Sequence, residues 1–126
     1  MIWANYVVLA GSLVGHEFEA SKRSAISRAY YGAFNVARRW LEARDMPIDN
    51  RGAHVRVWRT FRAARRATPD TREKWQMVGE LGGELRALRN QVDYADVVPG
   101  LDDQALDAVD TAERIIALLD ELELVD

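Results

Sequence analysis

Residues 86–96, with the sequence RALRNQVDYAD, hold the side chains best suited to chemistry in this chain. They bring a guanidinium, an amide and a phenol within about one and a half helical turns, on Arg89, Asn90 and Tyr94. Spacings of three and four predict a helix whose buried face carries Leu85, Leu88 and Val92. The polar set suits a phosphate group, because arginine offers a rigid fork of donors, asparagine orients a further group, and tyrosine donates a hydrogen bond or stacks.

The same residues also permit a purely structural interpretation. Arg89 and Asp93 are four residues apart, and ion pairs at this spacing on a solvated helix contribute only a few tenths of a kcal/mol. A single Arg-Asn pair is common on helices. Spacing alone therefore favours a solvated helix face over a binding site.

Five amphipathic helices are expected to position this segment. Apolar spacing predicts a first helix over residues 2–13, with Ile2, Tyr6, Leu9 and Leu13 facing inward. Proline and glycine breaks place the others at about 22–43, 51–67, from 70 to the break at 98–100, and from 102 onward. Ser21 or Ser24 is the expected N-cap of the second helix, and Asp70 that of the fourth. The expected fold is all-α, an up-and-down four-helix bundle with an additional helix, in one domain covering residues 1–126.

The inward faces of the later helices follow from the same spacing. The second helix has an apolar stripe of Ile26, Tyr30, Ala33, Ala37 and Trp40. The third presents Val55, Trp58 and Phe61, and the fifth presents Ala105, Val109, Ala112, Ile116 and Leu119. In the fourth, Gly79, Gly82 and Gly83 each cost about 1 kcal/mol if exposed, so we expect close backbone approach or a kink there.

The second helix carries another stripe that is polar, aromatic and small. Its members are Ser24, Arg28, Tyr31 and Asn35. One interpretation is a satisfied hydrogen-bond network between helices, since buried polar groups need partners. The other is a cleft wall that faces Arg89 and Asn90, with Arg28, Tyr31 and Asn35 binding RNA. One network can serve both purposes.

Charge is distributed unevenly along the chain. Residues 1–75 carry a net charge of +7 and residues 76–126 a net charge of −10. The predicted third helix is rich in arginine and has no acid, with Arg59, Arg62 and Arg66 at spacings of three and four. Such a stripe repels itself unless it pairs with an anion, either an RNA backbone or an acidic helix of the same chain.

Composition excludes several classes of site. The chain has no cysteine, so it has no disulfide framework and no thiolate metal site. Its two histidines, His16 and His54, are more often exposed or packed residues than ligands, and we expect no metal and no cofactor. The longest apolar run is too short to span a bilayer, so we expect no membrane association and a cytoplasmic location.

Two segments resemble the HEPN superfamily. They are residues 89–94, Arg-Asn followed by Asp-Tyr, and residues 24–35, SAISRAYYGAFN, which is the more specific of the two. The likeness is to small stand-alone members with an Arg-Asn-x-x-Asp-Tyr ending, and it covers roughly residues 3–119. It implies a four-helix bundle with an extra helix, working as a homodimer whose two motifs form one composite cleft for RNA. The family often has a histidine at the position of His54, which makes this residue a reserve candidate.

Active members of this family are metal-independent ribonucleases whose motif is an arginine, a polar residue and a histidine four to six residues after the arginine. Arg89 and Asn90 match the first two positions, but Tyr94 and Asp96 stand where the histidine is expected. Histidine titrates at about pH 6.5 and tyrosine at about 10, so the usual proton-exchanging group is missing. The resemblance implies that Arg89 binds the scissile phosphate, Asn90 orients it, and Tyr94 donates a proton or stacks.

Two main functions therefore stay open on the sequence. The first is an RNA-binding endoribonuclease that acts as a toxin or defence component. The second is a non-catalytic interaction module that pairs with a nucleotidyltransferase or an antitoxin, with Tyr94 as the acceptor of a nucleotide. A third, simpler alternative is a helical bundle that only oligomerises.

Overall fold

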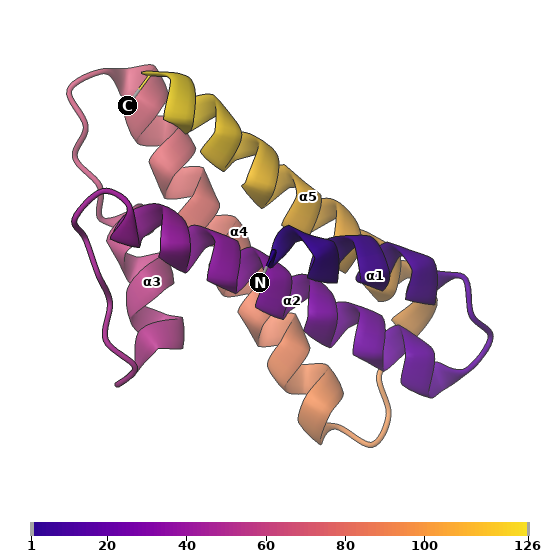
Figure 1. The fold of residues 1–126 in the computed structure, drawn as a ribbon. Coiled ribbons are helices and arrows are strands. Elements are labelled where there is room, and N and C mark those ends of the chain that lie inside the picture. The colour runs from indigo at the N-terminus through magenta and orange to yellow at the C-terminus, as the bar shows by residue number, and fades with distance from the viewer. Residues whose placement is uncertain (1, 126) are drawn as a thin grey trace.

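The computed structural model describes residues 2–125, which form five α-helices and no strand (Figure 1). The helices are α1 (Ala4–Val14), α2 (Glu19–Glu42), α3 (Ala53–Arg62), α4 (Pro69–Tyr94) and α5 (Leu101–Val125). The expected all-α fold with five helices is confirmed.

Helices α2, α4 and α5 form the centre of the molecule, because each contacts the other two. α1 lies against α2 and α5, and α3 lies mainly against α4 with a smaller contact to α2 (Figure 1). Within residues 2–125, α3 makes no contact with α5. The acidic α5 therefore does not cover the arginines of α3.

The apolar faces of α2 and α5 follow the sequence spacing. All five residues of the α2 stripe are buried, and four of the five on α5 are, while Ile116 is partly buried. The largest side chains enclosed between the helices are aromatic: Tyr30, Trp58, Phe61 and Trp75. The core is thus centred where α2, α3 and α4 meet.

The predicted inward face of α1 is wrong at two of its four residues, since Tyr6 and Leu13 are partly buried but Ile2 and Leu9 are exposed. Ile2 is 69% exposed and Leu9 is 42% exposed, whereas Val7 and Ala10 are buried. Almost every residue of this short helix is apolar, so periodicity does not single out one face. Contact with α2 decides it, because Gly32 lets Val7 approach so closely that a Cβ there would lie 2.9 Å from the valine methyl.

The predicted third helix is too long. α3 ends at Arg62, and Arg66 lies in the connection that turns the chain back to Pro69. Val55 is 36% exposed and Val57 is buried in its place, because α3 is covered mainly by α4 on one side.

The predicted helix caps are also wrong. Phe18 occupies the N-cap of α2 and Thr68 that of α4, and neither side chain makes a capping hydrogen bond. Ser21 and Ser24 lie inside α2, and Asp70 lies in the first turn of α4, where its charge still favours the helix dipole.

The glycines of α4 allow α3 to pack closely, as expected. A Cβ at Gly82 would lie 2.1 Å from the Trp58 ring, and one at Gly79 would lie 2.6 Å from the Trp58 carbonyl oxygen. Only glycine permits this separation of the two helices. The contact fixes α3 against α4 and places the start of α3 beside α2.

The helices within residues 2–125 include none that is long and apolar enough to cross a lipid bilayer.

Candidate functional site

Arg89 lies between α4 and α2 and is mostly buried, with 19% of its side chain exposed. Its guanidinium donates a hydrogen bond to the Tyr31 hydroxyl and lies 4.8 Å from the centre of the Tyr31 ring. It also pairs with Asp93 at 2.9 Å and donates to the Asn90 side-chain oxygen at 3.2 Å. The polar stripe of α2 and the arginine of α4 therefore meet through Tyr31 and Arg89.

A second polar contact lies beside the first and joins α2 to α3. The Tyr30 oxygen is 2.7 Å from His54 Nδ1, and Trp58 Nε1 donates to the same oxygen at 3.2 Å. The imidazole stacks on Phe34, with ring centres 4.0 Å apart and planes 18° from parallel. A half-buried histidine is thus held on two sides, by a hydroxyl and by a ring.

Electrostatics link these two contacts into one site. Burial lowers the pKa of His54 below its ordinary 6.5, and the nearby charges of Arg89, Arg86 and Arg38 lower it further. Burial raises the pKa of Tyr30 to about 12, so its phenol is protonated at neutral pH. We call the group formed by Tyr30, Tyr31, His54, Arg86 and Arg89 the α2–α4 site.

Arg86 stands out in the α2–α4 site because its charge is not compensated. Its side chain has no hydrogen-bond or ion-pair partner among residues 2–125, and its Nε atom is buried. Arg89, one turn further along α4, has Asp93. A half-buried cation without a partner is costly unless an anion from outside neutralises it.

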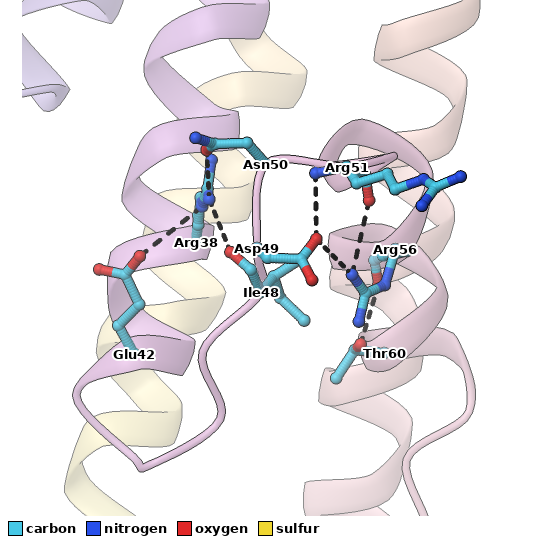
Figure 2. Close-up of polar contacts among 8 residues, drawn as sticks. All are labelled: Arg38, Glu42, Ile48, Asp49, Asn50, Arg51, Arg56 and Thr60. Carbon is cyan, nitrogen blue, oxygen red and sulfur yellow. Dashed lines mark hydrogen bonds and ion pairs between the residues drawn. The ribbon is translucent and has the colours of Figure 1, made fainter.

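Arg38 supports the site by holding the loop between α2 and α3. Its guanidinium donates to the Ile48 carbonyl at 2.6 Å and to the Asn50 side chain at 2.9 Å, and its Nε lies 3.6 Å from Glu42 (Figure 2). Asp49 then accepts hydrogen bonds from the Arg51 backbone and the Arg56 side chain, and Arg56 in turn is bonded through its carbonyl to Thr60 (Figure 2).

The loop ends at Gly52, whose φ of +67° is in the left-handed region that favours glycine. α3 begins at the next residue, Ala53, and His54 is therefore fixed in its first turn.

Tyr94 does not join Arg89, although the sequence grouped them. Five residues rotate a helix by about 140° beyond a full turn, so the two side chains leave α4 in different directions. The Tyr94 side chain is 82% exposed, and its hydroxyl has no hydrogen-bond partner within the described residues. It lines an open groove of about 430 Å³ in which the carboxylates of Glu19, Asp93 and Asp96 outnumber the single cation of Arg23.

The other predicted RNA-binding residues are divided between two regions. Arg28 donates to Ser24 at 3.2 Å, and Asn35 donates to the Tyr31 carbonyl at 2.9 Å, so both bond within α2. The predicted arginine stripe lies on α3 or just beyond it: Arg59, Arg62 and Arg66.

Arg59 is exposed, Arg62 donates to the Gly79 carbonyl at 3.3 Å, and Arg66 lies over the Trp75 ring at 4.1 Å. Gly79 precedes Arg89 by ten residues, about 15 Å along α4.

Sequence reasoning missed three members or supports of this site. Arg86 lies three residues before Arg89 in the segment 86–96, so both side chains share one face of the helix, but it is not part of the Arg-Asn motif. The apolar spacing of α2 identifies Tyr30 only as a core residue, and no motif in the sequence singles out Arg38. His54 is only a reserve candidate in the sequence, through the resemblance to a family that often has a histidine at this position.

The geometry of the α2–α4 site fits an oxyanion better than a metal. Cationic donors and phenols converge on it, and no cluster of three or more histidine or acidic side chains occurs within residues 2–125. No protein-family model, curated protein or solved structure matches the chain, so its function rests on the chemistry of these side chains.

Proposed function

We propose that the chain is a HEPN-like RNA-binding protein whose α2–α4 site binds a backbone phosphate. The observation that carries the proposal is Arg86, a half-buried cation without an anionic partner beside Arg89 and His54. A phosphate would neutralise this charge and accept charge-assisted hydrogen bonds. The sequence resemblance supplies the class of ligand, and the arginine pair supplies its binding chemistry.

RNA cleavage without a metal is the activity we propose for this site, in a cytoplasmic toxin or defence component. Arg89 and Arg86 are suited to hold the scissile phosphate and to stabilise the extra negative charge of the transition state. Asn90 contacts the Arg89 guanidinium and orients it. Because Tyr94 lies apart from this group, its hydroxyl is not placed to act beside Arg89 of the same chain.

The test is RNA binding and cleavage in EDTA by wild type, Arg86→Ala and Arg89→Ala. We expect each variant to weaken binding of single-stranded RNA roughly tenfold or more, since hydrogen bonds to charged groups are lost. Arg72→Ala is the matched control, because Arg72 is an exposed arginine on the same helix. Equal loss in the control would mean that only general positive charge matters, and no binding by wild type would refute the proposal.

A second function is favoured by one observation, the exposure of Tyr94. Its exposed hydroxyl at the end of α4 is accessible to another protein, as the acceptor in a nucleotide transfer must be. We propose as the alternative a non-catalytic module that pairs with a nucleotidyltransferase or an antitoxin.

Intact-mass analysis after incubation with candidate nucleotidyltransferases and ATP tests this alternative. We expect a mass increase of one nucleotide in wild type and none in Tyr94→Phe. The same increase in both proteins would place the modification on another residue.

A further inference from the structure

Hydrogen-bond chemistry determines which nitrogen of His54 carries the proton. The Trp58 indole can only donate, so the Tyr30 oxygen accepts from it. The phenol has a single proton, and among residues 2–125 the remaining partner that can receive it is His54 Nδ1 at 2.7 Å. Tyr30 therefore donates to Nδ1, and a neutral imidazole must carry its own proton on Nε2.

The Nε2 atom of this ring is free to meet a ligand. Within residues 2–125, His54 makes a single hydrogen bond, through Nδ1, and Phe34 fixes the plane of its ring. The cations that act on the imidazole come from two helices: Arg86 and Arg89 on α4 and Arg38 on α2. An uncharged N–H donor can stand among these arginines without adding to their repulsion, which suits a crowded phosphate site.

We propose that the Nε2–H group of His54 donates a hydrogen bond to a phosphate oxygen held by Arg86 and Arg89. Tyr30 is then a positioning residue, because its hydroxyl keeps the histidine in the Nε2–H tautomer. This role rests on the proposed function and adds a ligand to the same site. The chain lacks the histidine of the family motif on α4, and His54 supplies a histidine from α3 instead. His54 in this role is a neutral phosphate ligand and does not transfer a proton.

Because the chain has only two histidines, the tautomer of His54 can be measured directly. We would label the histidine rings with ¹⁵N and record long-range ¹H–¹⁵N spectra of the whole chain, with the exposed His16 as an internal reference. In the free protein at pH 7.5 we expect His54 to show a protonated Nε2 and an unprotonated Nδ1. A single-stranded RNA oligonucleotide should shift the His54 Nε2 signal and leave His16 unchanged. A proton on Nδ1, or an unmoved His54 signal in the RNA complex, would overturn the inference.

Two substitutions of His54 separate the contribution of its N–H donor to RNA binding from that of its ring. His54→Gln can place an amide N–H near the Nε2 position, whereas His54→Phe keeps the stacking on Phe34 without a donor. We expect RNA affinity to fall roughly tenfold in His54→Phe and by less than about threefold in His54→Gln. His16→Gln is the control and should bind as wild type does. Equal affinity of wild type and His54→Phe would overturn the inference.

Tyr30→Phe tests the positioning role separately. Without the phenol, we expect His54 to show a mixture of both tautomers and RNA affinity to fall by several-fold. A single Nε2–H tautomer in a folded Tyr30→Phe protein would overturn the role of Tyr30. If this variant fails to fold, the RNA affinities of His54→Phe and His54→Gln still test the contact between His54 and the phosphate.

The outcomes also distinguish the two proposals. If wild type binds neither RNA nor inorganic phosphate, the proposed function and the inference fail together. If RNA binds and depends on Arg86 and Arg89 but not on His54, the function stands and the inference alone is wrong.

Discussion

Tyr30 has two roles at the residue scale. Its ring is fully buried in the apolar face of α2, and its hydroxyl joins Trp58 to His54. A phenol in this position carries both hydrophobic burial and a polar contact between helices. Its removal therefore affects stability as well as the site.

Tyr30→Phe tests the energetic part of this role. The substitution keeps the ring but leaves the Trp58 indole without an acceptor and His54 Nδ1 without a donor. We expect the free energy of unfolding to fall by about 1–3 kcal/mol. Urea denaturation measures it, and Tyr94→Phe serves as the control because its exposed hydroxyl has no partner among the described residues. Similar losses in the two variants would contradict the assigned contact.

His54 makes stability depend on pH. Its folded-state pKa is below the ordinary 6.5, so the unfolded chain takes up the proton first as pH falls. The contribution of His54 is complete above pH 6.5 and is lost as pH falls from 6.5 to the lower folded-state pKa.

Unfolding at pH 7.5 and pH 5.5 measures this dependence. We expect the free energy of unfolding to drop less in His54→Phe than in wild type over this interval. His16→Phe should retain the wild-type drop. An identical pH dependence in wild type and His54→Phe would show that His54 does not titrate abnormally.

At the scale of elements, α3 is held in place mainly by α4. Trp58 and Phe61 are buried. Gly79 and Gly82 of α4 have no side chains, which leaves room for the backbone and ring of Trp58. The position of α3 sets that of His54 in its first turn. The helix pair therefore supports the site as well as the core.

Gly82→Ala and Gly83→Ala form a matched pair that tests this packing. Alanine gains about 1 kcal/mol of helix propensity at either position. At Gly82 the new methyl would lie 2.1 Å from the Trp58 ring, so we expect a net loss of about 1–3 kcal/mol. At Gly83 it would meet only the end of the flexible Arg62 side chain at 2.8 Å, so we expect no loss or a small gain. Thermal unfolding measures both, and a stabilised Gly82→Ala would contradict the close approach.

Arg23 of α2 holds the C-terminal end of α4 through hydrogen bonds. Its guanidinium donates to the carbonyls of Val92, Ala95 and Asp96 at 2.6, 2.7 and 2.9 Å. These bonds satisfy carbonyl groups that a helix end leaves unpaired. They tie the start of α2 to the end of α4 and limit how far the two helices beside the α2–α4 site can separate.

At the scale of the whole molecule, exposed apolar side chains gather at the end of the bundle where α2 begins, and Leu124 and Val125 are exposed at the end of α5. Where α2 begins and α4 ends, Phe18, Tyr94 and Val97 are 74%, 82% and 79% exposed. The C-terminal end of α5 lies at the opposite side of the molecule (Figure 1). Exposed apolar side chains near one end of a domain favour contact with another protein there.

We predict a homodimer that uses this end, near the arginines of α4. Light scattering after size exclusion should give about twice the chain mass of 14.3 kDa. Phe18→Ser with Val97→Asp should shift the protein toward monomer, because a charge would be buried in the interface. Leu124→Asp is the control, since Leu124 is 87% exposed on the terminal turn of α5. A wild-type monomer at all concentrations would refute the prediction.

Local patterns in the sequence were sufficient to predict the number of helices and much of the core. Periodic apolar residues identify an inward face, as in α2 and α5, because the spacing of a helix fixes which side chains share a face. Periodicity did not identify the inward face of α1, because almost every residue of that helix is apolar. It also misplaced the end of α3, which is covered by another helix mainly on one side. Glycine spacing in α4 predicted close approach because the cost of glycine needs a compensating contact.

Which polar side chains meet in the α2–α4 site depends on how the helices pack against one another. Periodicity gives a residue's direction on its own helix and says nothing of which helix lies opposite. Arg89 meets Tyr31 because α4 packs on α2. Tyr30 meets His54 because α3 packs on the α4 glycines and Arg38 holds the loop before it. Tyr94 is near Arg89 in sequence and leaves α4 in a different direction, because five residues rotate a helix by about 140° beyond a full turn.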